Sequence, residues 1–510
     1  MTASVPEFSG WYPYLTQRSR QWAWDLSRIL GFWIVLFNAG AYLAMVPAIS
    51  GSLGRSVDYG IWTQDFYFLS LGLSLPLLPW LHARWGRQRV LLWSFGIFAL
   101  CSVLVASTSN FCLLLLARVV AAWVGGWSLP LLAQEGARPG SARHQQVGNL
   151  FWTWAATIPF ALGPFWGGWI TDTWGWRWLF VLDIPFSALI ILGVVLGGQE
   201  EWHPTKLSFD WVGYLLLSLA AILAEMLLNL GNIRDWWHSS LLQVLFWLAF
   251  WTALASFLWL WSHPYPALRV SLLGSWNFLI AAVGTWLSAL LFVGGLALLV
   301  VHYQLSFGYS AELIGYYVLP MAILGPVILI LAQSHWRLLF PRFFLGLPSL
   351  LLAAAAFAMA SFALPISPGA LFVPMLLAGG GLGWLFPAWN SLALDSLPKE
   401  RKEEGARLLN WLRYLGLSMG IPTANGFWER RVVLHRHFLV EDRAWQSQLW
   451  EHTLQHFSKG LSVPGAEQFL AKQIAIQAQM LAFNEVFWVA AWGFLGLGLW
   501  SVLARFSVSS

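Results

Sequence analysis

Three ionisable residues interrupt long apolar stretches of the sequence at comparable depths. Counted at about 1.5 Å per helical residue from the start of each apolar run, Asp65, Arg118 and Asp183 each lie roughly 9–11 Å inside. Charged groups in apolar surroundings are costly and normally face a cavity or one another. The spacing therefore predicts an Asp65/Arg118/Asp183 cluster, which either exchanges a proton on one of its acids or forms a static ion pair that fixes helix packing.

Two further charged residues occur within apolar runs. Glu225 is expected about one helical turn from the end of its run, as a carboxylate reaching the interface or as a site for a proton or a cationic ligand. Arg413 is expected nearer mid-depth, paired with helix-end carbonyls or with an anionic ligand group. Asp172 lies at a predicted helix end and is expected to act as a cap or loop contact.

The elements that must hold these residues are membrane-spanning helices. The 510 residues include 28 Lys+Arg and 23 Asp+Glu, so only 10% are charged while 58% are apolar. Soluble domains carry about 25% charge, so this composition excludes a soluble globular protein. It also leaves no room for a soluble catalytic domain, and an enzyme is not expected. The net charge of +5 is spread over short loops, which fits membrane topology better than nucleic-acid binding.

Polar, Gly-rich and Pro-rich breaks divide the chain into fourteen predicted spans, each long enough to cross a hydrocarbon core roughly 30 Å thick. An even number places both termini on one side of the membrane. The spans are 29–50, 59–81, 90–108, 111–133, 146–170, 176–198, 209–230, 240–262, 276–301, 311–332, 340–364, 370–394, 404–425 and 481–504.

Basic residues set the predicted orientation. With a cytoplasmic N-terminus, the short outer loops hold only Arg55, Arg177 and Arg234, and most other Lys and Arg residues fall in the inner segments. This asymmetry follows the positive-inside rule and places both termini in the cytoplasm. It also places the long segment 426–480 outside, as a mostly polar, amphipathic loop whose run 445–457 could lie on the membrane or meet a partner.

No cofactor and no metal site are expected. The Gly-rich stretches lack the Lys and Ser/Thr of a phosphate-binding loop, which argues against direct use of ATP. His452 and His456 have helical spacing, but no cysteine or acidic residue completes a zinc site around them.

Several motifs resemble the fourteen-helix drug:proton antiporters of the major facilitator superfamily. The run 163–172, GPFWGGWITD, resembles their antiporter motif, and 80–87, WLHARWGR, their basic gating loop. The thirteenth span and the long segment 426–480 resemble the inner-membrane pump subunits of tripartite efflux systems. The residues that carry the antiporter and gating-loop resemblance are Gly163, Pro164, Gly167, Gly168, Arg84, Gly86 and Arg87.

The resemblance implies an all-α membrane protein of the major facilitator fold, with two six-helix halves and two additional helices between them. The expected divisions are a cytoplasmic segment 1–28, an N-terminal half 29–198, linking helices 199–275, and a C-terminal half 276–510 that includes the loop 426–480. It further implies a bacterial inner-membrane location in contact with the lipid bilayer, export of hydrophobic small molecules against proton influx, and partnership with a periplasmic membrane-fusion adaptor and an outer-membrane channel.

The chain departs from this pattern at positions that matter for proton coupling. Where the family usually has an acid in the first span, nine residues before a proline, this chain has Asn38, whose amide cannot carry an exchangeable proton near neutral pH. Ala83 replaces a frequent Asp in the gating loop. Any proton carrier must therefore lie elsewhere, and Asn38 and Arg413 stay candidates for lining the substrate cavity.

Three functions remain open from the sequence. The first is proton-coupled multidrug efflux. The second is a dedicated exporter of an endogenous product such as a siderophore, fatty acid or lipid-like metabolite, which the changed acids would fit. The third is a membrane scaffold or receptor that keeps the fold without transporting.

Overall fold

The computed structural model describes residues 17–133, 142–197, 204, 207–332, 341–364, 366–445 and 463–504. All regular structure in these residues is helical, and each of the fourteen predicted spans coincides with helical structure. Ten helices among the described residues are long and apolar enough to cross a membrane. His452 and His456, and most of the run 445–457, lie outside the described residues.

The N-terminal half is a bundle in which α1 lies at the centre, packed on α6, α7, α2 and α5. Long apolar runs bury its helices against one another, and Gly86, with φ of 77°, turns the chain between α3 and α4. The elements are α1 (Gln17–Ser52), α2 (Val57–Ser74), η2 (Leu75–Leu77), α3 (Leu78–Trp85), α4 (Arg87–Ser107), α5 (Phe111–Ala133), α6 (Ala142–Thr173) and α7 (Arg177–Gly197).

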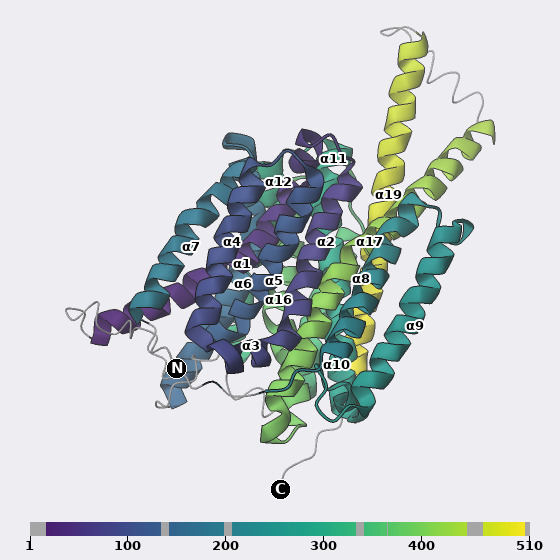
Figure 1. Ribbon diagram of the computed structural model, residues 1–510. Helices are drawn as coiled ribbons and strands as arrows, with labels where there is room; N and C mark the ends of the chain where they lie inside the picture. Colours follow the sequence, from purple (N-terminus) through teal and green to yellow (C-terminus); the bar gives the residue numbers. More distant parts are fainter. Residues whose placement is uncertain are drawn as a thin grey trace.

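Two linking helices, α8 (Trp211–Ile233) and α9 (Ser240–Ser262), lie on one side of the bundle (Figure 1). Asp210 ties them together, because its carboxylate accepts hydrogen bonds from the Gly213 amide that starts α8 and from Trp259 near the end of α9. α8 packs on α2 and α17, whereas α9 packs on α8 and leaves most of its surface exposed for lipid. The linking pair therefore contacts both halves of the bundle.

The C-terminal half surrounds α10, which packs on α17, α16 and α19. A π-helical turn, η6, follows α10 directly and places His302 in the interior. The elements are α10 (Trp276–Ala297), η6 (Leu298–His302), α11 (Tyr303–Phe307), α12 (Ala311–Val318), α13 (Met321–Ala332), α15 (Pro341–Met359), α16 (Pro368–Asp395), α17 (Lys402–Trp445) and α19 (Val463–Trp500), with short 3-10 turns η7 (Lys399–Arg401) and η8 (Ser501–Leu503). Two further 3-10 turns, η4 (Trp236–His238) and η5 (Val270–Gly274), belong to the linking region.

The segment predicted as a loop from 426 to 480 is largely helical. α17 runs without a break to Trp445, and α19 begins at Val463, so both helices extend well past the spans 404–425 and 481–504. These extensions, residues 426–445 and 463–480, form a helical projection beyond one end of the bundle (Figure 1). We term this end of the bundle the projection end. Their polar composition hid the helix from a search for apolar runs.

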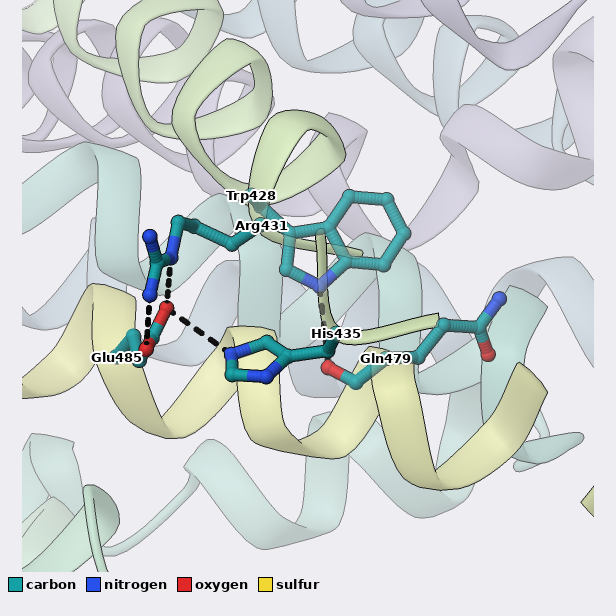
Figure 2. A network of polar contacts seen from close by, with 5 residues as sticks. All are labelled: Trp428, Arg431, His435, Gln479 and Glu485. Carbon is teal, nitrogen blue, oxygen red and sulfur yellow. Dashed lines mark hydrogen bonds and ion pairs between the residues drawn. The ribbon is translucent and has the colours of Figure 1, made fainter. Parts of the chain in front are cut away.

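A polar contact holds the base of the projection together. Arg431 of α17 donates two hydrogen bonds to the Glu485 carboxylate of α19, and His435 Nε2 lies 3.2 Å from Glu485 Oε2 (Figure 2). The Trp428 indole also donates to the Gln479 carbonyl at 3.4 Å. The hydrogen bonds that Arg431 donates to Glu485 raise the pKa of Arg431 above its ordinary value, so the guanidinium stays charged.

Candidate functional site

Arg118 of α5 and Asp183 of α7 meet in the N-terminal half through an amide between them. Arg118 donates to Asn38 Oδ1 at 3.0 Å and to Gln64 Oε1 at 3.2 Å. The Asn38 amide in turn donates to both Asp183 oxygens at 2.9 Å, and Ser102 donates to Asp183 Oδ2 at 3.2 Å. These five residues, the Arg118 cluster, are all buried.

Aromatic rings complete the surroundings of the Arg118 guanidinium. Its central carbon lies 4.1 Å from the Tyr42 ring centroid and 4.2 Å from that of Tyr67, with Phe180 at 5.7 Å. Such cation–π contacts and the opposite charge of Asp183 offset part of the cost of burying the cation. The arrangement holds a guanidinium and a carboxyl group, joined through the Asn38 amide, inside an apolar bundle.

Asp65 does not join the Arg118 cluster. Gln64 faces Arg118, and its neighbour Asp65 is turned by about 100° around α2, since a helix has 3.6 residues per turn. Its carboxylate is fully buried beside Glu225 and Asn229 of α8. The predicted three-residue cluster is thus divided, because equal depth in the membrane does not fix the direction in which a side chain points.

Glu225 is also buried, contrary to the expectation of a carboxylate at the interface. Its exposed fraction is 0%, because α2 and α17 cover this face of α8. Asn229 donates to Glu225 Oε1 and to the Glu225 carbonyl, each at 3.1 Å, and Ser418 of α17 lies on the other side. We refer to Asp65 and Glu225 together as the acid pair.

Arg413 lies half-buried in the first third of α17, near the middle of the predicted span 404–425. Its guanidinium carbon is 5.3 Å from the Phe386 ring centroid and 5.1 Å from that of Tyr414. These aromatic faces are the contacts that the structure describes for the guanidinium, and its predicted partners, helix-end carbonyls or an anionic ligand group, stay predictions. An aromatic-lined cation at this depth remains suited to an anionic substrate group.

The antiporter-motif glycines lie at two close backbone contacts of α6, one with α1 of the same half and one with α12 of the other half. A Cβ on Gly163 or Gly167 would come within 2.5 Å of the Ala41 backbone of α1, and one on Gly168 within 2.2 Å of the Ala311 carbonyl oxygen of α12. Small residues allow such close backbone approach. The contact continues where Asp172 Oδ2 accepts a hydrogen bond from the Glu312 amide at 2.8 Å, so Asp172 caps a helix of the other half.

The basic gating loop lies at the end opposite the projection, around α3 (Figure 1). Arg84 packs over the Trp80 ring with its guanidinium carbon 5.7 Å from the centroid, and Arg87 over Trp24 at 5.1 Å. Gly86 supplies the positive φ that lets α4 start immediately after α3.

A small apolar cavity of about 40 Å³ lies in the C-terminal half. It is bordered by α10, η6, α13, α15, α16 and α19, and every side chain that lines it is apolar. Leu299, Leu352, Met375 and Phe487 are among them. A lining of this kind offers apolar contacts and no hydrogen-bonding side chain to a ligand.

Sequence reasoning missed five polar residues that organise these sites. Gln64 and Asn229 were overlooked because single amides in apolar runs are common, and no pattern marked them. His302 Nε2 bonds Asn425 Oδ1 at 2.7 Å, and the Asn425 amide donates to Glu429 at 3.0 Å. The spacing of Asn425 and Glu429 on one helix face was a usable signal for the last pair.

Comparison with known proteins identifies the family to which this fold belongs. The model of the Major Facilitator Superfamily matches residues 29–421. Multidrug export protein EmrB of Haemophilus influenzae is 28% identical over 461 residues, 89% of each chain. Fatty acid resistance protein FarB of Neisseria gonorrhoeae is 24% identical over 480 residues, 93% of this chain and 94% of its own.

Solved structures agree at the level of the fold. A peptide transporter POT in complex with sulfate superposes with a TM-score of 0.60 at 13% identity, covering 98% of this chain and 100% of the other. A bacterial homologue of the human lysosomal transporter Spinster gives 0.58 at 14% identity, with 98% and 100% covered. With its family match extending through both halves, the chain belongs to the Major Facilitator Superfamily of membrane transporters.

Proposed function

We propose that the protein exports hydrophobic and amphipathic compounds from a bacterial cell by alternating access, driven by proton influx. The observation that carries the substrate class is the wholly apolar lining of the cavity in the C-terminal half. The similarity to relatives named for multidrug export and fatty acid resistance supports the same class. Two halves joined by close backbone contacts along α6 supply the rigid units that alternating access requires.

The substrate class can be tested in proteoliposomes with an imposed pH gradient. Ethidium, a hydrophobic cation, and oleate, an anionic amphiphile, serve as probes. We expect gradient-dependent movement of at least one of them. Movement of oleate without ethidium would favour a dedicated exporter of a lipid-like product, and movement of neither would contradict the proposed substrate class.

A matched pair of substitutions on α15 tests the cavity itself. Leu352→Trp fills the space, because Leu352 lines it, whereas Leu350, two residues away, is 42% exposed at the surface of the bundle. We expect Leu352→Trp to raise the substrate concentration needed for half-maximal transport and Leu350→Trp to leave it unchanged. Equal effects of the two substitutions would argue that substrate binds elsewhere.

We further propose that the projection end faces the periplasm and that both termini are cytoplasmic, as the distribution of Arg and Lys favours. A membrane-impermeant maleimide applied to intact spheroplasts should then label Arg436→Cys on the projection and spare Glu400→Cys, in a background lacking Cys101 and Cys112. The reverse labelling pattern would overturn this orientation.

The projection is proposed to dock a periplasmic membrane-fusion adaptor of a tripartite efflux system. Large apolar side chains are exposed on it, including Val433 at 70% and Phe438 at 53%. Exposed apolar residues on a charged helix pair are typical of a protein interface. Replacement of both by Ser should abolish co-purification with the adaptor encoded in the same genome and leave transport in proteoliposomes intact. Undiminished co-purification would place docking elsewhere.

A further inference from the structure

We propose that the acid pair, Asp65 and Glu225, is the proton-binding site of the transporter, and that the linking helix α8 thereby takes part in energy coupling. The inference rests on the proposed proton-driven export and names the groups that carry the proton. It assigns a role to a helix that otherwise serves as a connection between the two halves.

The first support is the burial of two carboxyl groups against each other. Both residues have an exposed fraction of 0%, and the charge of Glu225 acts directly on Asp65 across the α2–α8 contact. Two ionised carboxylates side by side in apolar surroundings repel each other without water to screen them. The stable arrangement is therefore one carboxylate and one neutral carboxylic acid, which share a single exchangeable proton.

The second support is the hydrogen-bonding capacity that the site leaves unused. Asn229 directs its amide hydrogens to Glu225, and the Ser418 hydroxyl donates to the Leu415 carbonyl at 3.0 Å. Among the described residues, both oxygens of Asp65 and Oε2 of Glu225 lack a hydrogen bond of ordinary geometry, although all three are shielded from solvent and the Asn229 amide lies close to Asp65. A proton placed between two such carboxyls satisfies an acceptor on each side.

The third support is a small cavity next to the acid pair, lined by both polar and apolar residues. It has a volume of about 10 Å³ between α2, α8 and α17, and Asn229, which hydrogen-bonds Glu225, forms part of its wall. Asp58 lines the same cavity and is half-exposed near the start of α2, at the projection end. The cavity thus connects the projection end with the residue that hydrogen-bonds Glu225.

Further proton-accepting and proton-donating groups line this route. Asn425 belongs to the cavity wall and bridges Glu429 of α17 to His302 of η6 through two hydrogen bonds. Asp58 and Glu429 are close enough to interact electrostatically, so the entrance carries acidic groups that attract cations. π-helical turns such as η6 occur frequently at functional sites.

The remaining charges on the packed helices act elsewhere. Arg118 of α5, on the other side of α2, is engaged with Gln64 and Asn38. Asp58 lines the cavity, and Glu429 and His302 connect to it through hydrogen bonds with Asn425. Among the described residues, the charge that lies beside Asp65 is that of Glu225, and no ion pair with a cation is described for either acid. A proton is the remaining means of neutralisation.

The site lies where a proton can be coupled to the movement of the halves. Asp65 belongs to the N-terminal half, Ser418 and Asn425 to α17 of the C-terminal half, and Glu225 to the helix packed on both. In the proposed step, a proton from the projection end binds the ionised carboxylate, and the same proton leaves to the opposite side after the halves rearrange. No covalent bond changes other than the O–H bond.

Transport assays separate proton coupling from substrate movement. In proteoliposomes, Asp65→Asn and Glu225→Gln should lose pH-gradient-driven accumulation of ethidium or oleate and retain exchange of the same probe at equal pH on both sides. Glu312→Gln, which neutralises an exposed acid on α12, should retain both activities. Gradient-driven accumulation in both acid-pair variants would overturn the inference and leave the proposed export intact. Accumulation driven by a sodium gradient alone would overturn the assignment of a proton.

A second measurement needs no transported probe, so it stands even if the proposed substrates are wrong. Dicyclohexylcarbodiimide reacts with protonated carboxyls in apolar surroundings and can be located by mass spectrometry. We expect labelling of Asp65 or Glu225 in the wild-type protein at neutral pH, decreasing as pH rises, and persistence of this labelling in Glu312→Gln. Absence of label at both residues in wild-type protein, at pH values where the fold is intact, would contradict the shared proton.

Discussion

Two adjacent residues of α2 lie in different electrostatic environments. Gln64 belongs to the Arg118 cluster, where a cation, an anion and two amides are connected by hydrogen bonds. Asp65 belongs to the acid pair, where two carboxyls meet without a cation acting on Asp65 among the described residues. Hydrogen bonds connect every member of the Arg118 cluster, whereas the acid pair places two like-charged groups beside each other. This difference is the basis of the proposed proton site.

The largest expected effect is a loss of stability when the Arg118 cluster is disrupted. Arg118→Met should leave the side-chain oxygens of Asn38 and Gln64 buried without their donor, which typically costs about 1–3 kcal/mol for each unsatisfied group. We expect a lower melting temperature in detergent and little folded protein. Arg118→Lys, which keeps the charge but not the forked donors, should lose less stability. Wild-type stability of Arg118→Met would show that the cluster does not hold the bundle together.

The next effect concerns the contact that joins the halves. Gly168→Val should prevent the close approach of α6 to Ala311, at a cost of about 1–3 kcal/mol in the closed arrangement, and should reduce transport more than stability. Disulfide formation between Asp172→Cys and Glu312→Cys reports this contact. Gly96→Val is a matched control, since a Cβ at Gly96 meets open space. Unchanged cross-linking in Gly168→Val would contradict the close contact.

A smaller effect is expected when stability is measured on the acid pair. Asp65→Asn removes a carboxylate that makes no hydrogen bond of ordinary geometry, so the free energy of unfolding should change by no more than about 1 kcal/mol. The contrast with Arg118→Met is the most direct test of the comparison, because Gln64 and Asp65, adjacent residues of α2, belong to the two different sites. A loss of stability as large as that of Arg118→Met would assign the acid pair a structural role.

The smallest effect is expected at the base of the projection. Arg431→Gln removes a charge pair whose side chains are 33% and 31% exposed, and pairs of this kind contribute up to about 1 kcal/mol. Thermal unfolding should be nearly unchanged, while the projection should become easier to digest with protease at limiting concentrations. Protection equal to wild type would show that Trp428 and the helix packing suffice.

The sequence allowed the helices and the depths of charged residues to be predicted, but not the directions of their side chains. Apolar runs locate a span to within a few residues, and Asp65, Arg118, Asp183 and Glu225 were identified from the cost of burying charge. Their grouping was not accessible, because one residue of helical rotation moves a side chain by about 100°. Asn38 was noted as a lost acid, whereas its role as the bridge between Arg118 and Asp183 required the structure.

The projection was missed for a different reason. A search for membrane spans detects apolar composition, and α17 becomes polar after Pro422 while its backbone hydrogen bonding continues. Predicting a loop there confused the end of an apolar run with the end of a helix. The motif glycines were recognised as sites of close approach, but their partners on α1 and α12 came from the structure.

The continuity of α17 has a mechanical consequence. At about 1.5 Å per residue its 44 residues extend roughly 66 Å. One segment of this rod lines the cavity beside the acid pair, through Asn425, and another forms half of the projection. Because both segments belong to one continuous helix, a tilt of α17 at either segment also displaces the other. A partner bound to the projection would therefore move the part of α17 that covers the acid pair.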